Sequence, residues 1–162
     1  MKRDFFPWDK WQYYKIYIHN KSCDAFLSKT IFPMTQKMLK EKLISRWFFI
    51  RYYDPDFHLR IRFEVDSIQH IPNLIKIIAQ HLSPLCKIGL ISNVSISTYQ
   101  REIERYGKNF IDASETIFFI DSICICKILT KLKNDETSKF ILSFKIVDLY
   151  LFLAYGTSVS KK

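Results

Sequence analysis

The sequence predicts an α+β fold: a mostly antiparallel sheet in the ferredoxin-like β-α-β-β-α-β order, with additional C-terminal helices. Three observations favour this fold. Residues 57–65 alternate strictly between apolar and polar side chains, the period of a strand with one buried face. Residues 53–56 read Tyr-Asp-Pro-Asp, a turn signal that joins this strand to the apolar segment before it. Helix-like segments separate the other strands. With 162 residues, the chain is expected to form one domain, residues 1–162.

The first half of the chain is expected to contain a strand, a helix and the hairpin. The first strand covers residues 11–19. A helix follows from about residue 23 to residue 42, with Asp24 as its N-cap and a kink or break at Pro33, because proline removes a backbone donor. Residues 44–52 are apolar on both faces, which predicts a central position in the sheet.

The second half is expected to add a helix, one more strand and the C-terminal helices. The predicted segments are a helix over 68–82, a strand over 88–99, a short charged helix, and helices over 112–132 and 135–155. In this order of elements, two helices cover one face of the sheet and the other face is free to bind a ligand. The free face is expected to hold Tyr13, Tyr17, His19, Arg51, His58, Arg60 and Arg62.

Arg60 and Arg62 are the most informative pair on that face. They lie two positions apart on the alternating strand, together with His58 and Glu64, so their side chains point the same way. Two guanidinium groups on a rigid strand suit a carboxylate or phosphate, which arginine binds with two hydrogen bonds. The alternative is an ordinary sheet face whose charges are solvated.

The composition limits the classes of function. The net charge of +9 favours an anionic partner, such as nucleic acid, an acidic peptide, a phosphate ligand or anionic lipid. No block of five like charges occurs, so direct nucleic-acid binding is not expected. With only three glycines, the glycine-rich phosphate loops of nucleotide-binding folds are excluded. No signal peptide and no membrane span are expected, which favours a cytoplasmic protein.

The four cysteines predict neither a metal site nor a disulfide framework. Cys23, Cys86, Cys124 and Cys126 contain no C-x-x-C pair, and positions i and i+2 of a helix diverge. Free buried thiols in a reducing compartment are expected instead.

A second cluster of charge follows the last predicted strand, at Tyr99-Gln-Arg-Glu-Ile-Glu-Arg-Tyr-Gly107. On a helix, Glu102 and Arg105 are i,i+3 neighbours, as in a solvated surface helix. A second interpretation places Arg105 in one basic pocket with Arg60 and Arg62, and makes Glu102 an orienting group or a base.

These segments carry a resemblance to a known family. Trp47–Tyr52, Asp54-Pro55, His58–Phe63, Tyr99–Gly107 and Asp121-Ser122, taken in this order, resemble the lantibiotic dehydratase C-terminal domain, also called the thiopeptide-type bacteriocin biosynthesis domain. The resemblance runs from about Trp11 to beyond Asp121. It implies elimination of glutamate from glutamylated Ser or Thr of a precursor peptide, which leaves dehydroalanine or dehydrobutyrine. No cofactor or metal is implied.

The resemblance also implies roles for individual residues. The catalytic set is expected to be Arg60, Arg62, Glu102, Arg105 and His58, and the substrate-binding set Arg51, Tyr99, Arg101 and Tyr17. The arginines would hold the glutamyl carboxylates and stabilise the negative charge that forms when the Cα proton leaves. A base and an acid are needed as well.

The expected partners are a ribosomally made precursor peptide and a separate glutamylating subunit, and a homodimer is left open. The family's domain continues past the point where this chain stops, and an important histidine lies in that later part. A truncated, split or non-catalytic member is therefore expected, slow or inactive by itself. The alternatives are a cycloaddition enzyme of thiopeptide maturation and a non-catalytic subunit that binds the precursor peptide.

Overall fold

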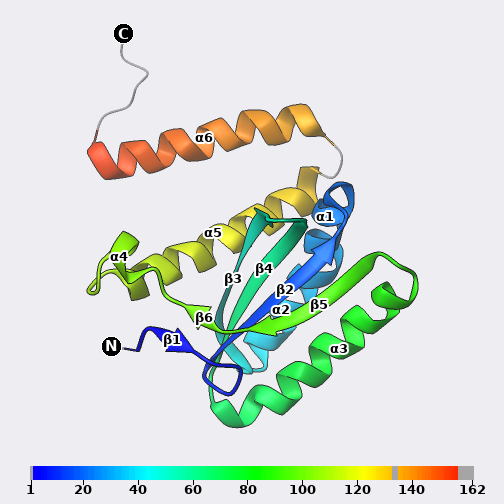
Figure 1. Ribbon diagram of the computed structural model, residues 1–162. Helices are drawn as coiled ribbons and strands as arrows, with labels where there is room; N and C mark the ends of the chain where they lie inside the picture. Colours follow the sequence, from blue (N-terminus) through cyan, green and yellow to red (C-terminus); the bar gives the residue numbers. More distant parts are fainter. Residues whose placement is uncertain (1, 133–134, 157–162) are drawn as a thin grey trace.

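Four antiparallel strands form the centre of the protein, in the spatial order β3-β4-β2-β5 (Figure 1). The computed structural model describes residues 2–132 and 135–156. The strands are β2 (Trp11–Ile18), β3 (Ile44–Tyr53), β4 (Phe57–Val65) and β5 (Ile91–Ser97). With helices after β2 and after β4, the chain follows the β-α-β-β-α-β order, so the predicted α+β fold and its antiparallel sheet are confirmed.

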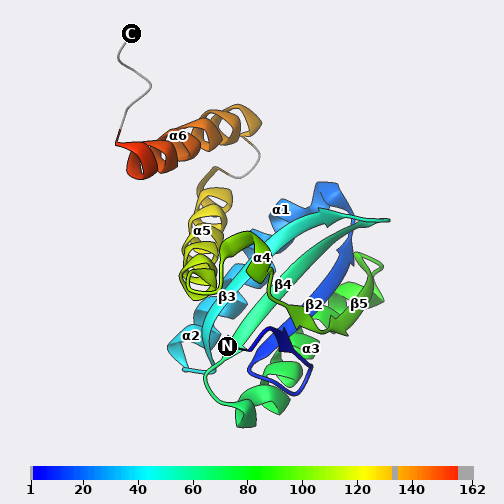
Figure 2. The ribbon, with the colours of Figure 1, turned by 60° about the vertical axis from the view of Figure 1, so that its left-hand side comes forward.

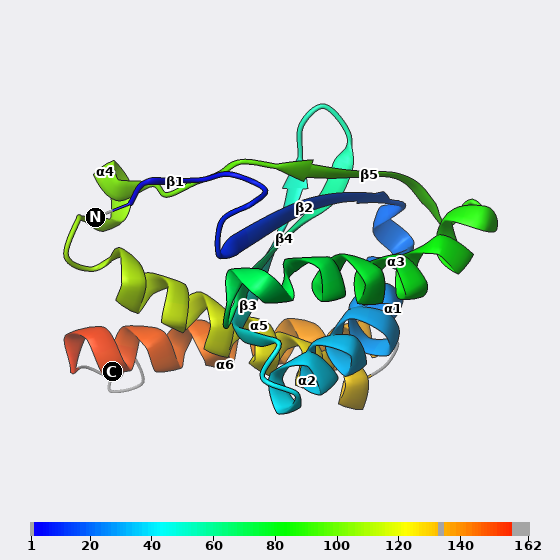
Figure 3. The same cartoon turned by 90° about the horizontal axis from the view of Figure 1, so that it is seen from below.

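The helices α1 (Cys23–Phe26), α2 (Phe32–Lys40) and α3 (Ile71–Lys87) lie together on one side of the sheet (Figure 3). Between them and the strands lies the main core, to which β4 contributes its alternate residues Leu59, Ile61, Phe63 and Val65, all buried. The alternation of residues 57–65 therefore predicted the buried face of this strand correctly.

The predicted helix over 23–42 is present, but it begins and bends differently. A 3₁₀ turn (Asn20–Ser22) precedes α1, so Asp24 lies inside the helix rather than at its N-cap. A π-helical turn (Leu27–Ile31) separates α1 from α2. Pro33 falls in the first turn of α2, where its missing N–H costs little, and the wider turn before it accommodates the proline ring.

The prediction that residues 44–52 form a central strand is wrong. In the described sheet β3 pairs with β4 alone and forms an edge. The long helix α5 (Ile111–Leu132) covers that edge, and the backbone N–H of Phe49 donates to Ser122 Oγ of α5 at 3.1 Å. Trp47 and Phe48 are buried on opposite faces of β3, whereas residues 50–53 are exposed, so only the first part of this edge strand needs apolar surface on both faces.

The predicted strand over 88–99 divides into two parts. β5 ends at Ser97, and β6 (Tyr99–Gln100) leaves the main sheet to pair with β1 (Asp4–Phe5). This small sheet lies over one end of the face that α1–α3 leave open, and α4 (Ile103–Tyr106) follows it (Figure 1). Phe5 and Tyr99 join Trp11, Tyr13 and Phe48 in a second apolar cluster on this face.

After α5 the described chain continues into α6 (Glu136–Tyr155), which lies on the α5 side of the molecule (Figure 2). None of the helices in the described part is long and apolar enough to cross a membrane. Within the same residues, no group of three His, Cys, Asp or Glu side chains is placed to hold a metal ion. The four cysteines are free, but only Cys23 and Cys126 are buried, whereas Cys86 and Cys124 are exposed.

Candidate functional site

Cross-strand pairing arranges His58, Arg60 and Arg62 of β4 in three rows on the open face, and Glu64 forms a fourth row with Trp11 and Arg46. Residues that pair directly across neighbouring strands share a face. The first three rows, each with its β2 residue, β4 residue and β3 residue, are Tyr17–His58–Tyr52, Lys15–Arg60–Ile50 and Tyr13–Arg62–Phe48. His58, Arg60 and Arg62 therefore lie together on the open face, as the alternation predicted.

Arg62 is a buried cation surrounded by aromatic rings. Its exposed fraction is 7%. Its Cζ lies 4.5 Å from the ring centre of Tyr13, 4.7 Å from that of Tyr99 and 5.2 Å from that of Phe48. The Nε and Nη1 atoms have no hydrogen-bond partner among the described residues. Burial lowers the pKa of Arg62, but an arginine pKa starts so high that the side chain stays charged.

A small cleft opens beside Arg62 under α4. Its other walls include Gln100, Glu102, Tyr106 and Phe118. The cleft has a volume of about 20 Å³, which is room for about one water molecule. Glu102 contributes to the wall although its side chain is 59% exposed. Glu102 is thus the acidic residue of the described chain that borders the Arg62 cleft.

Arg60 is held by two neighbours in the adjacent row. Its Cζ lies 3.3 Å from the ring centre of Tyr52, and its Nε donates to His58 Nε2 at 3.1 Å. His58 Nδ1 lies 2.9 Å from the carbonyl oxygen of Asp56. A carbonyl can only accept, so Nδ1 carries the proton and Nε2 is the acceptor.

His58 therefore has both ring nitrogens engaged. Its side chain is 1% exposed, and its ring stacks on that of Tyr17 at 4.8 Å. This arrangement suits a residue that fixes the position of Arg60. It leaves neither nitrogen free for proton transfer to a ligand.

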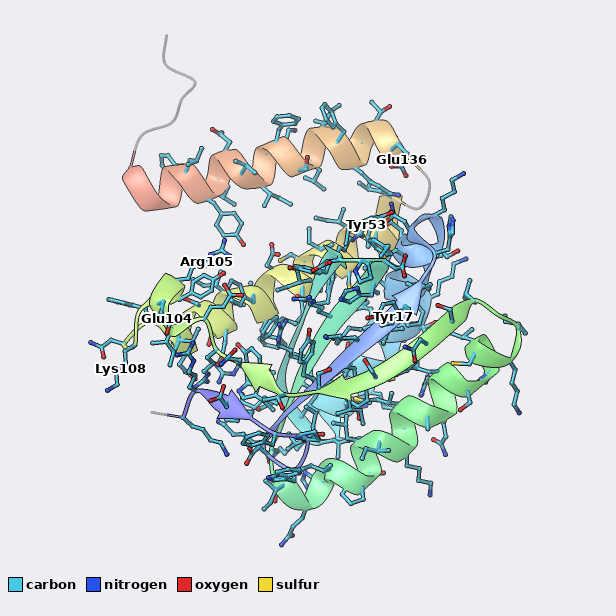
Figure 4. The ribbon with its side chains drawn as sticks, viewed as in Figure 1. Tyr17, Tyr53, Glu104, Arg105, Lys108 and Glu136 are labelled. Carbon is cyan, nitrogen blue, oxygen red and sulfur yellow. The ribbon has the colours of Figure 1, made fainter. Side chains whose placement is uncertain are left out.

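Arg105 is not among the residues that line the Arg62 cleft. On α4 its side chain is 71% exposed, with Nη1 3.4 Å from Glu102 and Cζ 5.3 Å from the ring centre of Tyr106. Figure 4 shows Arg105 beside Glu104 and Lys108, well away from Tyr17. The structure brings Glu102, rather than Arg105, to the cleft of Arg62.

Arg101 and Tyr99 are buried, and both bind a carboxylate that the sequence analysis did not assign to the site. Glu115 of α5 is 0% exposed. It accepts from Arg101 Nε at 2.7 Å, from Arg101 Nη2 at 2.5 Å and from the Tyr99 hydroxyl at 2.8 Å. Burial, together with the charge of Glu115, raises the pKa of Tyr99 well above its usual range, so Tyr99 stays neutral.

A pattern in the sequence could have indicated Glu115. Helix α5 buries Ile111, Glu115, Ser122, Cys126 and Leu129, which recur at helical spacing. An acidic residue within such a stripe needs a buried partner. The alternation of the strands indicated which arginines share a face, but it could not indicate Glu115, which lies on a helix.

Arg51 is not on the open face, so this part of the prediction is wrong. It pairs across the sheet with Leu59, which points into the main core. Its Nη2 lies 2.6 Å from Asp24 of α1, on the helical side. Because β3 is apolar on both faces, its pattern alone did not reveal which residues share a face with Arg60.

The chain is similar to proteins of lantibiotic biosynthesis. Residues 11–162 match a family model described as the lantibiotic biosynthesis dehydratase C-term. The chain is 31% identical over 154 residues to the nisin biosynthesis protein NisB of Lactococcus lactis subsp. lactis, covering 94% of this chain and 15% of NisB. It is 31% identical over 117 residues to the subtilin biosynthesis protein SpaB of Bacillus subtilis, covering 72% of this chain and 11% of SpaB.

A solved structure supports the same relationship. The crystal structure of the tRNA-dependent lantibiotic dehydratase MibB from Microbispora sp. 107891 superposes with a TM-score of 0.68 at 29% identity, covering 74% of this chain and 12% of that chain. The chain thus spans only a small part of the length of these relatives. The family match over residues 11–162 and the shared fold place the chain in the lantibiotic dehydratase C-terminal domain family.

Proposed function

We propose that this chain supplies the anion-binding half of a glutamate-elimination site, which acts on glutamylated Ser or Thr residues of a ribosomally made precursor peptide. One observation carries the proposal: Arg62 is buried, charged and without a hydrogen-bond partner for Nε and Nη1 among the described residues. A buried charge is costly unless a counter-charge compensates it. A ligand carboxylate at Arg62 provides that compensation.

The reaction needs an anion site of this kind. A base removes the Cα proton, its electron pair forms the Cα=Cβ bond, and the Cβ–O bond breaks to release glutamate as a carboxylate. Arg62 binds the departing carboxylate with charge-assisted hydrogen bonds, and Arg60, in the next row, stabilises negative charge on the peptide carbonyl. Glu102, at the wall of the cleft, is positioned to act as the base, and Arg105 orients it through their ion pair.

A second acid or base is expected from outside the described residues. Glutamate leaves as a carboxylate and needs no proton, but negative charge develops on the peptide carbonyl as the Cα proton leaves, so a proton donor near that oxygen is needed as well as a base. His58 is fixed between Arg60 and the backbone, and the wall of the cleft contains no histidine. We therefore propose that a partner polypeptide, the glutamylating protein, completes the site.

The test is elimination from a glutamylated precursor peptide, followed by mass spectrometry. We expect glutamate release when the chain is combined with the glutamylating protein, and release at least about a hundredfold slower from the chain alone, the cost of a missing acid or base. Arg62→Gln should abolish release in the combined reaction. Arg51→Gln is the matched control on the opposite face and should release glutamate at the wild-type rate.

Two outcomes would overturn the proposal. Peptide binding without glutamate release in either format would identify a non-catalytic peptide-binding subunit. Equal release by wild type and Arg62→Gln would show that the buried arginine is not part of the site.

A further inference from the structure

Two buried arginines are connected through Tyr99, and only one of them is paired: Arg62 lies over the Tyr99 ring, and Arg101 shares the carboxylate of Glu115 with the Tyr99 hydroxyl. Arg101 has both Nε and Nη2 bonded to Glu115, whereas Arg62 has neither Nε nor Nη1 bonded. Both side chains are about equally buried, with residue exposures of 6% and 7%. The buried carboxylate that accepts from the Tyr99 hydroxyl is therefore bonded to Arg101, and not to Arg62.

Tyr99 connects the two arginines. Its hydroxyl donates to Glu115 Oε1, while its ring faces Arg62 at 4.7 Å. The same ring packs against Phe5, Trp11 and Phe48, which hold it in place. Through this hydrogen bond Glu115 fixes the ring that forms one wall around Arg62.

Arg101 is in turn anchored away from the site. Its backbone N–H donates to the carbonyl of Arg3 at 3.0 Å, and its Cζ lies 5.0 Å from the ring centre of Phe5. With an exposed fraction of 6%, its guanidinium is directed to Glu115 and is not available to a peptide on the open face.

We infer that Arg101 and Glu115 are positioning residues that keep Arg62 unpaired: Glu115 fixes Tyr99 over Arg62, and Arg101 neutralises Glu115 so that its charge does not compete with the ligand. The inference rests on the proposed function in one respect, that the ligand of Arg62 is an anion. The sequence predicted that Arg101 binds the substrate. We infer instead that Arg101 holds Arg62 in the state that binds the substrate.

A double-mutant cycle tests the inference. Arg101→Met leaves Glu115, which is hydrogen-bonded to Tyr99 beside Arg62, with Arg46 at 4.0 Å as its remaining cation among the described residues. The charge of Glu115 is then only partly compensated, and the variant should bind a fluorescently labelled glutamylated precursor peptide about tenfold more weakly. Adding Glu115→Gln removes that charge but keeps an acceptor for Tyr99, so the double variant should recover most of the lost affinity. Replacing a buried ion pair by neutral groups of similar size is often tolerated, so the double variant is expected to fold.

Arg3→Met is the matched control. Arg3 lies in the adjoining segment, pairs with Glu104 and has a 45% exposed side chain, so its loss changes the net charge equally without reaching Arg62. This variant should bind the peptide as wild type does. A loss of affinity that persists in the double variant would show that Arg101 does not act through the charge of Glu115.

The side-chain NMR signal of Arg62 Nε–Hε separates this inference from the proposed function. In the ligand-free protein the signal should shift in Arg101→Met and return in the double variant. If wild type does not bind the peptide, the proposed function fails while the ligand-free signal still decides the inference. An unchanged Arg62 signal in folded Arg101→Met, or no recovery in the double variant, would overturn it.

Discussion

Two buried arginines, Arg62 on the open face of the sheet and Arg101 after β6, differ in whether a carboxylate pairs with them. Around Arg101, every buried charge has a partner: Glu115 binds Arg101, and nearby Glu64 binds Arg46 and Lys10. Around Arg62, three aromatic rings take the place of a carboxylate. The paired cluster attaches α5 and β6 to the sheet, which is a structural role. The unpaired arginine retains its capacity to bind an anion, which is the property a ligand site needs.

The largest expected effect distinguishes the two arginines by stability. Arg101→Met removes the cation that is hydrogen-bonded to buried Glu115 and leaves Arg46, 4.0 Å away, as its remaining ion-pair partner among the described residues, so it should lower the free energy of unfolding by about 3 kcal/mol. Arg62→Met removes a desolvated cation that has little compensation and should change it by less than about 1 kcal/mol, or increase it. Urea denaturation followed by circular dichroism measures both values. Equal losses would mean that Arg62 has a structural partner after all.

The second prediction sharpens the role of the unpaired arginine. Arg62→Lys keeps the charge but loses the planar pair of donors, so affinity for a glutamylated precursor peptide should fall about thirtyfold, or about 2 kcal/mol. Calorimetric titration measures the affinity. Arg51→Lys, on the helical side, should leave it unchanged. Wild-type affinity in Arg62→Lys would favour a non-specific cation effect.

The third prediction concerns the pH dependence of the paired cluster. Burial opposes ionisation of Glu64, but hydrogen bonds from Arg46 and Lys10, each 2.6 Å long, hold the pKa of Glu64 below its ordinary value of 4.5. A lowered pKa contributes stability that is present above pH 4.5 and is lost as the pH falls through the folded-state pKa.

Glu64→Gln should therefore cost about 1.5 kcal/mol at neutral pH, since it weakens hydrogen bonds between charged groups. The difference from wild type should narrow as the pH falls below 4.5. Thermal unfolding of both proteins across this pH range measures the difference. A constant difference at all pH values would show that Glu64 acts by packing rather than by charge.

The sequence predicted the order of helices and strands along the chain and the shared face of His58, Arg60 and Arg62, because alternation and the hairpin turn are local signals. It did not predict that Arg62 is covered. The cover comes from Tyr99 on β6 and Phe48 on β3, and contacts between distant segments leave no periodic trace in either segment.

The two errors on β3 have a common physical origin. The sequence of β3, an edge strand next to α5, is apolar on both faces, like that of a central strand. Its pattern therefore shows neither where the strand lies in the sheet nor on which face the Arg51 side chain lies. The ferredoxin-like order, which puts the second strand at an edge, was the better guide. The order of helices and strands indicates the edge position of β3, whereas the composition of the strand does not.

The most direct test of the unpaired arginine compares Arg62 and Arg101 in one NMR titration. With arginine side chains labelled, L-glutamate is added to the wild-type protein and the Nε–Hε signals are followed. The Arg62 signal should move saturably, and the Arg101 signal, already bonded to Glu115, should stay in place. An Arg62 signal that does not move at saturating glutamate, or that moves no more than that of Arg101, would contradict the account.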